Sequence, residues 1–352
     1  MELFVRYPAN PIIQPGPPAW RQAVTFNPAV IADPAGGYAL IERVSGGFRP
    51  FHCSLGLQHS PDGIHFEQVG DAPVFTPAMA GSEHGSVQDP RIVALDGTYY
   101  LSFAFRPFAW ASHPTGVGVP ESHQVDFPGF SGKDADNQTR SGLATSIDLR
   151  EWIFHSWVTA PTIDDRNVIL FPEKIGGRYA VLRRPSTFVG TLANHASKPG
   201  IMLSWSQDLC NWTDPEPLLQ PSLAWEDNRI GGSTPPIRTE AGWLVFYHAV
   251  QTLDANQRRV CYRMGAVLLD LENPFKVLAR AHKPLLEPVE YYERVGAYIP
   301  NVVFPTSALL RDEDFTGQTA GGPCIWLYYG CCDTCIGLAC ASLEVVLSRL
   351  QP

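Results

Sequence analysis

GTYYLSF at residues 97–103 is one of five copies of one pattern, and this repetition predicts the fold. Each copy is a glycine or a turn followed by an aromatic-rich apolar run. The other copies are GGYALIER (36–43), GRYAVLRR (177–184), GWLVFYH (242–248) and IWLYYG (325–330). Short runs rich in Tyr, Phe, Val and Ile, with alternation visible in several, predict β-strands.

A second strand-like element follows each copy. It consists of small and apolar residues and often ends in Ser-x-Asp, as in LGLQHSPDGIHF (55–66) and SGLATSIDLREW (141–152). The other three are GIMLSWSQDLCNW (200–212), RMGAVLLDLENPF (263–275) and IGLACASLEVV (336–346). An Asp-Gly or Asp-Leu placed before a Phe or Trp indicates a hairpin turn that leads into an outer strand.

The repetition predicts an all-β fold. Each repeat forms one antiparallel sheet that is too small to bury its own faces, and five such sheets arranged radially bury one another. We therefore predict a five-bladed β-propeller. Residues 1–352 are expected to form a single catalytic domain, with the active site at one mouth of the central channel.

A long insertion, residues 106–140, interrupts the second copy. A loop of this length in a compact domain is usually functional or disordered. Its Phe, Trp and His content favours a lid over a solvated linker, with Trp110, Phe127 and Phe130 as candidate sugar-stacking or packing groups. We expect the insertion to cover the channel mouth and to shape the acceptor subsite.

Composition excludes several classes of function. The chain carries 26 Lys and Arg against 35 Asp and Glu, a net charge of -9, which argues against nucleic acid as a partner. We find no apolar run long enough for a membrane span and no secretory signal, so we expect a cytoplasmic protein without a membrane partner.

Eight cysteines lie mostly in apolar, strand-like stretches. The segment CCDTC (331–335) contains a C-x-x-C, but no second pair stands at zinc spacing. We predict reduced, packed cysteines and no metal, with a redox or metal role as the alternative.

Polar residues interrupt the strand pattern near the ends of the predicted innermost strands. The set comprises Asn27, Arg43, Asp89, Arg91, Arg166, Arg184, Arg229, His248, Tyr262 and Asp333. Asp89 stands out, because Asp and the Pro90 that follows it are both poor strand residues. It is either a turn residue that opens a strand or a catalytic acid held on a rigid rim.

The arginines of this set point to an anion. Several arginines around one channel mouth would repel one another unless an anion lay between them, and guanidinium groups match phosphate geometry well. The alternative is a separate salt bridge for each arginine, with Glu42, Glu173 or Asp165 as partners. That alternative is simpler for any single arginine, but for the whole set we favour a shared anion site.

The segments that carry these residues resemble glycoside hydrolase family 130, the family of β-mannoside phosphorylases and β-mannosidases. The resemblance rests on SVQDPRI (86–92), NVILFPEKIGGRYAVLRRP (167–185), RIGGSTPPIRTEAGWLVFYHAV (229–250), YRMGAVLLDLENPFKVLARAHKPLLEP (262–288), GAYIPNVVFP (296–305) and YYGCCDTCIGLA (328–339). It runs from about Asn27 to Leu343 and covers all five predicted blades.

The resemblance implies a role for each residue of the set. Asp89 matches the general acid, although Gln88 stands where the family often has Glu. The positions that hold inorganic phosphate match Arg166, Arg184, Arg229, His248 and Tyr262, with Arg229 in place of a common Lys. Positions around the mannosyl unit match Asn27, Arg43 and Asp333, and we place Arg91 with this substrate-binding group.

This chemistry agrees with the residue pattern. A retaining glycosidase needs two carboxyl groups about 5 Å apart, whereas only one acid stands out here. Inverting phosphorolysis needs one acid to protonate the leaving oxygen, because phosphate itself is the nucleophile. We therefore predict an inverting phosphorylase of β-mannooligosaccharides or β-mannosyl sugars. It would take inorganic phosphate as co-substrate, need no cofactor and release α-mannose 1-phosphate.

Two other functions stay open at this point. The first is an inverting β-mannosidase, in which Glu226 or Asp227 would activate water; the presence of both His248 and Tyr262 favours the phosphorylase. The second is a sugar-binding propeller without activity. The sequence does not fix the linkage (β-1,2 or β-1,4), the acceptor sugar or the oligomeric state, a homo-oligomer included.

Overall fold

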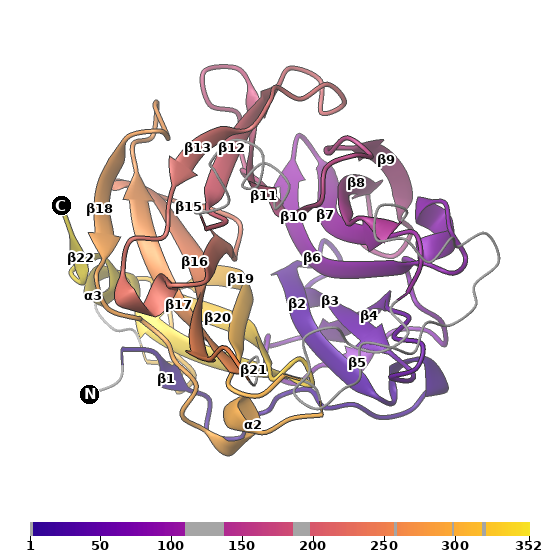
Figure 1. The fold of residues 1–352 in the computed structure, drawn as a ribbon. Coiled ribbons are helices and arrows are strands. Elements are labelled where there is room, and N and C mark those ends of the chain that lie inside the picture. Colours follow the sequence, from indigo (N-terminus) through magenta and orange to yellow (C-terminus); the bar gives the residue numbers. More distant parts are fainter. Residues whose placement is uncertain (1–2, 110–136, 186–197, 257–258, 298, 319–321) are drawn as a thin grey trace.

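The computed structural model describes residues 3–109, 137–185, 198–256, 259–297, 299–318 and 322–352. Five antiparallel sheets are arranged in a ring around a central axis (Figure 1). This is the predicted five-bladed β-propeller. The predicted lid within residues 106–140 lies largely outside the described residues.

The first three blades each contain four strands. The first blade consists of β2 (Val24–Ala32), β3 (Tyr38–Ser45), β4 (Ser54–Ser60) and β5 (Glu67–Gln68). The second consists of β6 (Ser86–Leu95), β7 (Thr98–Arg106), β8 (Arg140–Ser146) and β9 (Ile153–Trp157). The third consists of β10 (Asp165–Leu170), β11 (Tyr179–Pro185), β12 (Ile201–Ser206) and β13 (Glu216–Leu219).

The two remaining blades contain the chain termini. The fourth consists of β14 (Arg229–Gly232), β15 (Ile237–Thr239), β16 (Gly242–Asp254), β17 (Arg259–Leu269), β18 (Val277–Ala281) and the C-terminal β22 (Leu350–Gln351). The fifth consists of β19 (Val303–Arg311), β20 (Cys324–Cys331), β21 (Cys335–Ser342) and the N-terminal β1 (Val5–Arg6). Short helical turns connect blades: η1 (Ala19–Arg21), η2 (Pro77–Ala80), η4 (Ala224–Glu226), α2 (Tyr291–Arg294) and α3 (Leu343–Leu347).

The five aromatic-rich runs of the sequence are the second strands of the blades, and the five small-residue runs are the third strands. Strands β2, β6, β10, β14 and β19 precede them and lie innermost. The core lies between neighbouring blades, where five apolar clusters each join residues of two adjacent sheets. This confirms that each sheet is buried by its neighbours.

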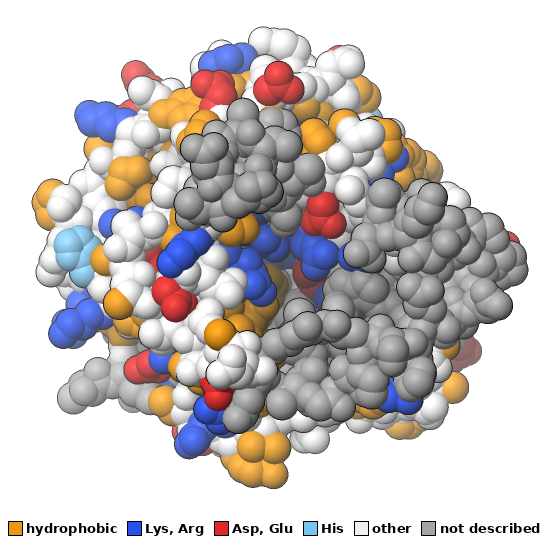
Figure 2. Space-filling view, viewed as in Figure 1, with side chains coloured by type: hydrophobic (Ala, Val, Ile, Leu, Met, Phe, Trp, Pro, Cys, Tyr) orange, Lys and Arg blue, Asp and Glu red, His pale blue; other side chains and the backbone are white. Residues whose placement is uncertain are grey.

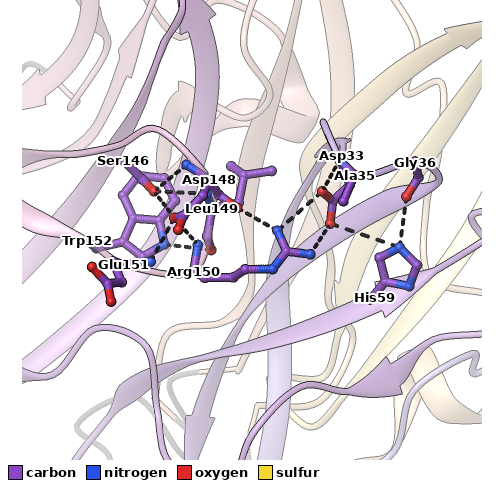
Figure 3. A network of polar contacts seen from close by, with 10 residues as sticks. All are labelled: Asp33, Ala35, Gly36, His59, Ser146, Asp148, Leu149, Arg150, Glu151 and Trp152. Carbon is purple, nitrogen blue, oxygen red and sulfur yellow. Dashed lines mark hydrogen bonds and ion pairs between the residues drawn. The ribbon is translucent and has the colours of Figure 1, made fainter.

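The Ser-x-Asp motifs form the predicted hairpin turns. In the second blade the Asp148 carboxylate accepts the backbone N–H groups of Arg150 and Glu151, while the Ser146 hydroxyl accepts that of Leu149 (Figure 3). Arg150 then reaches into the first blade and forms an ion pair with the buried Asp33, at 2.9 Å (Figure 3). The turn motif therefore shapes one blade and also braces it against the next.

The innermost strands of the first three blades share an irregularity. Their pairing with the second strands shifts register next to Asn27, Asp89 and Asn167. These residues have positive φ angles of 46°, 52° and 56°, a conformation that Asn and Asp tolerate better than most residues. The interpretation of Asp89 as a turn residue that opens a strand is therefore wrong. It lies at a β-bulge inside β6, and bulges commonly redirect a side chain.

No helix among the described residues is long and apolar enough to cross a membrane. All eight cysteines are free thiols, and every one except Cys210 is buried.

Candidate active site

A cavity of about 110 Å³ brings together every predicted site residue except Arg91. It is lined by Asn27, Arg43, Asp89, Arg166, Arg184, Arg229, His248, Tyr262 and Asp333, together with Gln88, Asn167, Ile299 and Phe304. Figure 2 shows Lys and Arg side chains gathered around the hollow at the centre of the viewed face. Residues far apart in the sequence thus meet where the blades converge.

The site residues come mainly from the innermost and second strands of the blades. The innermost strands supply Asn27, Asp89, Arg166 and Arg229, and the second strands supply Arg43, Arg184 and His248. Tyr262 comes from β17, and Asp333 from the turn between β20 and β21. All five blades therefore contribute to one site.

Asp89 is held by donors from the first blade. Its Oδ1 accepts hydrogen bonds from Asn27 Nδ2 at 2.8 Å and from Arg43 Nη1 at 2.9 Å. Burial raises the pKa of Asp89, but the charges of Arg43 and Arg91 and the bonds from Asn27 and Arg43 outweigh it and leave the pKa below its usual value. In the free protein Asp89 is therefore a carboxylate at neutral pH.

Arg43 also influences the second carboxyl group of the cavity. Its guanidinium lies over the rings of Phe26 and Phe51, and its Nε donates to Cys53 Sγ at 3.3 Å. Burial raises the pKa of Asp333 to about 7; the charge of Arg43 opposes this rise and that of Asp89 adds to it. The two carboxyl groups thus have pKa values shifted in opposite directions.

The other end of the cavity is crowded with cations. Burial, followed by the charges of Arg229 and Arg166, lowers the pKa of Arg184 to about 9. Arg229 donates to the Tyr262 hydroxyl at 2.5 Å, and Arg166 lies 3.7 Å from Asp164. Several like charges that together lower the pKa of Arg184 mark a site that favours an anion.

The acids proposed as separate partners for these arginines bind other cations. Glu42 pairs with Arg21 at 3.0 Å, Glu173 with Arg238 at 2.8 Å and Asp165 with Arg183 at 2.7 Å. The structure therefore contradicts that alternative for these three acids.

His248 and Tyr262 lie side by side on the paired strands β16 and β17 of the fourth blade. Their ring centroids are 6.2 Å apart, and the Phe304 ring packs against both. Burial lowers the pKa of His248 well below its usual value, and the charges of Arg184, Arg229 and Arg91 lower it further. His248 is therefore neutral at neutral pH and carries one N–H donor.

Sequence reasoning missed Asn167 as a site residue. It is 5% exposed, and its buried Nδ2 has no hydrogen-bond partner among the described residues. The missing signal was positional, because Asn167 stands at the same bulge position in its blade as Asn27 and Asp89. Arg91, in contrast, does not line the cavity and donates to the backbone carbonyl groups of Ser233 and Asp89.

The acids expected to activate water in a hydrolase do not line the cavity either. Glu226 is fully buried, forms a bidentate pair with Arg280 at 2.7 and 2.8 Å, and accepts the Tyr247 hydroxyl hydrogen. Asp227 accepts the backbone N–H of Thr252. The structure therefore removes the two residues on which the hydrolase alternative depended.

A larger cavity of about 780 Å³ lies elsewhere, between the N-terminal residues Leu3–Arg6 and residues 282–289 and 348–351. It contains none of the predicted site residues. Within the described part of the chain, no group of three or more His, Cys, Asp or Glu side chains is placed to hold a metal ion.

Comparison with known proteins identifies the family of this chain. The model of glycoside hydrolase family 130, described as beta-1,4-mannooligosaccharide phosphorylase, matches residues 5–116 and 127–351. The chain is 36% identical to a 1,2-beta-oligomannan phosphorylase of Thermoanaerobacter sp. (strain X514), over 92% of each chain. It is 31% identical to a beta-1,4-mannooligosaccharide phosphorylase of Ruminococcus albus, over 99% of this chain and 91% of the other.

A solved structure shows the same fold. The beta-1,2-mannobiose phosphorylase from Listeria innocua, in complex with beta-1,2-mannobiose, superposes with a TM-score of 0.71 at 24% identity, over 98% of both chains. Since the family model and the curated relatives match nearly the whole chain, this protein is an enzyme that belongs to glycoside hydrolase family 130.

Proposed function

We propose that this enzyme carries out the inverting phosphorolysis of β-mannosides and releases α-mannose 1-phosphate. The observation that carries the proposal is that the lining of one cavity contains two groups of interacting side chains, which we call its acid end and its phosphate end. At the acid end Asp89 binds Asn27 and Arg43. The phosphate end comprises Arg166, Arg184, Arg229, the neutral His248 and Tyr262. The relatives named as mannoside phosphorylases support the same reaction.

The reaction would proceed in one displacement. A phosphate oxygen attacks the anomeric carbon of the mannosyl unit from the face opposite the leaving oxygen. The bond from that carbon to the leaving oxygen breaks, its electron pair stays on the oxygen, and a proton from Asp89 neutralises it, directly or through a sugar hydroxyl. Attack from the opposite face inverts the β-linkage, so the product is the α-phosphate.

The cations hold the nucleophile. Arg184 and Arg229 repel each other in the free protein, and an inorganic phosphate between them would relieve that repulsion. Tyr262 and the neutral His248 add single hydrogen-bond donors, and Asn167 offers a buried N–H that has no partner among the described residues. Inorganic phosphate is thus the co-substrate of the proposal, and no further cofactor takes part.

The proposal has to supply a proton to Asp89, which is ionised in the free protein. A bound phosphate partly cancels the field of the arginines, and a bound sugar displaces water, so both raise the pKa of Asp89. Asp333, with a pKa of about 7, lies in the same cavity and is a proton source close to neutral pH. Asn27, Arg43 and Asp333 are the proposed contacts of the mannosyl unit.

Product analysis tests the function. The enzyme is incubated with β-1,2-mannobiose, β-1,4-mannobiose and β-mannosyl-N-acetylglucosamine, each with and without inorganic phosphate. We expect α-mannose 1-phosphate to form at a rate that rises with phosphate and saturates. Asp89→Asn should lose roughly 10²–10⁴-fold of that rate while keeping the fold. Free mannose formed at an equal rate without phosphate would contradict the proposal and restore the hydrolase.

A further inference from the structure

Arg91 does not line the cavity, and its contacts join three blades. It is 2% exposed and comes from β6 in the second blade. Its Nη1 donates to the backbone carbonyl of Asp89 at 2.7 Å, and its Nε donates to that of Ser233, just after β14 in the fourth blade, at 2.8 Å. Its guanidinium also lies 5.5 Å from the centre of the Phe304 ring in the fifth blade.

Both carbonyl groups belong to residues tied to the site. Asp89 is the proposed acid and stands at a bulge with a positive φ angle. The Ser233 hydroxyl lies 3.4 Å from Nδ1 of His248, at the phosphate end. Phe304, the third contact of Arg91, packs on His248 with ring centroids 4.6 Å apart. The buried guanidinium of Arg91 therefore contacts Asp89 itself, and it also contacts Ser233 and Phe304, the two residues that lie against His248.

We propose that Arg91 is a positioning residue that fixes the acid Asp89 and the phosphate-binding His248 relative to each other. This inference rests on the proposed function and deepens it. An in-line displacement needs the proton donor and the nucleophile on opposite faces of one carbon, so their separation controls the rate. Arg91 sets that separation without touching the substrate, which replaces its predicted role as a substrate contact.

The burial of Arg91 carries a desolvation cost, which a positioning role would explain. Burial lowers its pKa to about 10, and its Nη2 has no partner among the described residues. A methionine would fill similar space without that desolvation cost. However, it would leave the carbonyl groups of Asp89 and Ser233 without the guanidinium donor. The bulge that aims Asp89 would then lose its connection to the fourth blade.

The experiment compares Arg91→Met and Arg91→Lys with wild type in steady-state kinetics. We expect Arg91→Met to lower kcat about 10–100-fold with the KM for mannoside nearly unchanged, because a displacement of about 1 Å costs this much. Arg91→Lys keeps the charge, but one ammonium cannot reproduce the fork to two carbonyls, so it should lose less than Met but remain below wild type. If Arg91→Met does not fold, the kcat and KM of Arg91→Lys test the inference, which predicts a lower kcat with the KM for mannoside nearly unchanged.

A pH profile separates positioning from a merely structural role. The groups that face Asp89 from the first, second and fifth blades are Asn27, Arg43, Cys53, Arg91 and Asp333. The limb of the pH–rate profile that reports Asp89 is the one that disappears in Asp89→Asn. Because the charge of Arg91 lowers the pKa of Asp89, Arg91→Met should shift this limb to higher pH. Arg311→Met is the matched control, because Arg311 also donates to a backbone carbonyl and lies over aromatic rings, but outside the cavity. It should leave that limb in place.

A double-mutant cycle completes the test. If Arg91 acts through Asp89, Arg91→Met should cost far less in the Asp89→Asn background than in wild type. Equal losses in both backgrounds, or a raised mannoside KM with kcat intact, would overturn the inference. If wild type releases free mannose independently of phosphate, the proposed function fails. The same cycle on that hydrolysis rate would still test Arg91.

Discussion

Asn27 and Gly330 face each other at the junction of the first and fifth blades, and Asn27 Oδ1 occupies the space that any side chain on residue 330 would need. The Nδ2 of the same Asn27 side chain donates to Asp89. The absence of a Cβ atom in β20 therefore allows Asn27 to hold the proposed acid from the neighbouring blade.

Gly330→Ala should therefore lower kcat/KM by displacing Asn27, although residue 330 is not itself the proposed acid. The new methyl group would push Asn27 away from Asp89, and loss of a hydrogen bond to a charged group costs roughly 1.5–3 kcal/mol, or about ten- to a hundredfold in kcat/KM. The measurement is kcat/KM for the preferred mannoside. Gly47→Ala is the control, because nothing lies within 4 Å of its Cβ position. A folded Gly330→Ala with wild-type turnover would contradict this account.

Gly231→Ala should act on the phosphate end instead. A Cβ atom there would stand 2.6 Å from His248 Cε1 and 2.7 Å from Asn167 Nδ2. Both side chains must move, so the KM for phosphate should rise about tenfold or more, while the KM for mannoside changes little. Initial rates over a grid of both substrates separate the two constants. A rise confined to the mannoside KM would place His248 and Asn167 with the sugar.

The sequence predicted the propeller because its repeats are local. An aromatic-rich run and a small-residue run follow each other within every blade, so the pattern GTYYLSF followed by SGLATSIDLREW already describes two paired strands. The turn chemistry of Ser146 and Asp148 is local as well. Such features need no knowledge of distant contacts.

The site was predicted less evenly, because its remaining features depend on contacts between blades. Arg91 and Arg184 both lie next to an apolar strand run, so the sequence does not distinguish them. The structure shows that Arg184 lines the cavity, whereas Arg91 does not and donates to a backbone carbonyl group. Glu226 appeared available as a base because nothing in its own segment shows Arg280, which comes from an outer strand. Asn167 was missed because its bulge became visible only from strand register.

Glu226→Gln tests its structural role. Gln keeps the shape but leaves Arg280 without its counter-ion in a buried place, and breaking a buried pair by removing one partner costs about 3–5 kcal/mol. Urea unfolding should show this loss, whereas the ratio of phosphorolysis to hydrolysis should not change. A selective fall in hydrolysis at unchanged stability would instead make Glu226 the base of a hydrolase.

Asp333→Asn should stabilise the protein at alkaline pH. The folded protein raises the pKa of Asp333 from 3.8 to about 7, so folding favours its protonated form. As pH rises through that window, the unfolded chain ionises first and stability falls; above it the penalty is complete. Asn imitates the protonated carboxyl, so the Tm of the variant relative to wild type should rise from about pH 4 to about pH 8.

Asp89→Asn is the control of opposite sign, because the lowered pKa of Asp89 contributes stability above the usual Asp range. This variant should therefore lower Tm at about pH 8. A lower Tm for Asp333→Asn at alkaline pH would mean that Asp333 is held as a carboxylate and cannot supply the proton for Asp89.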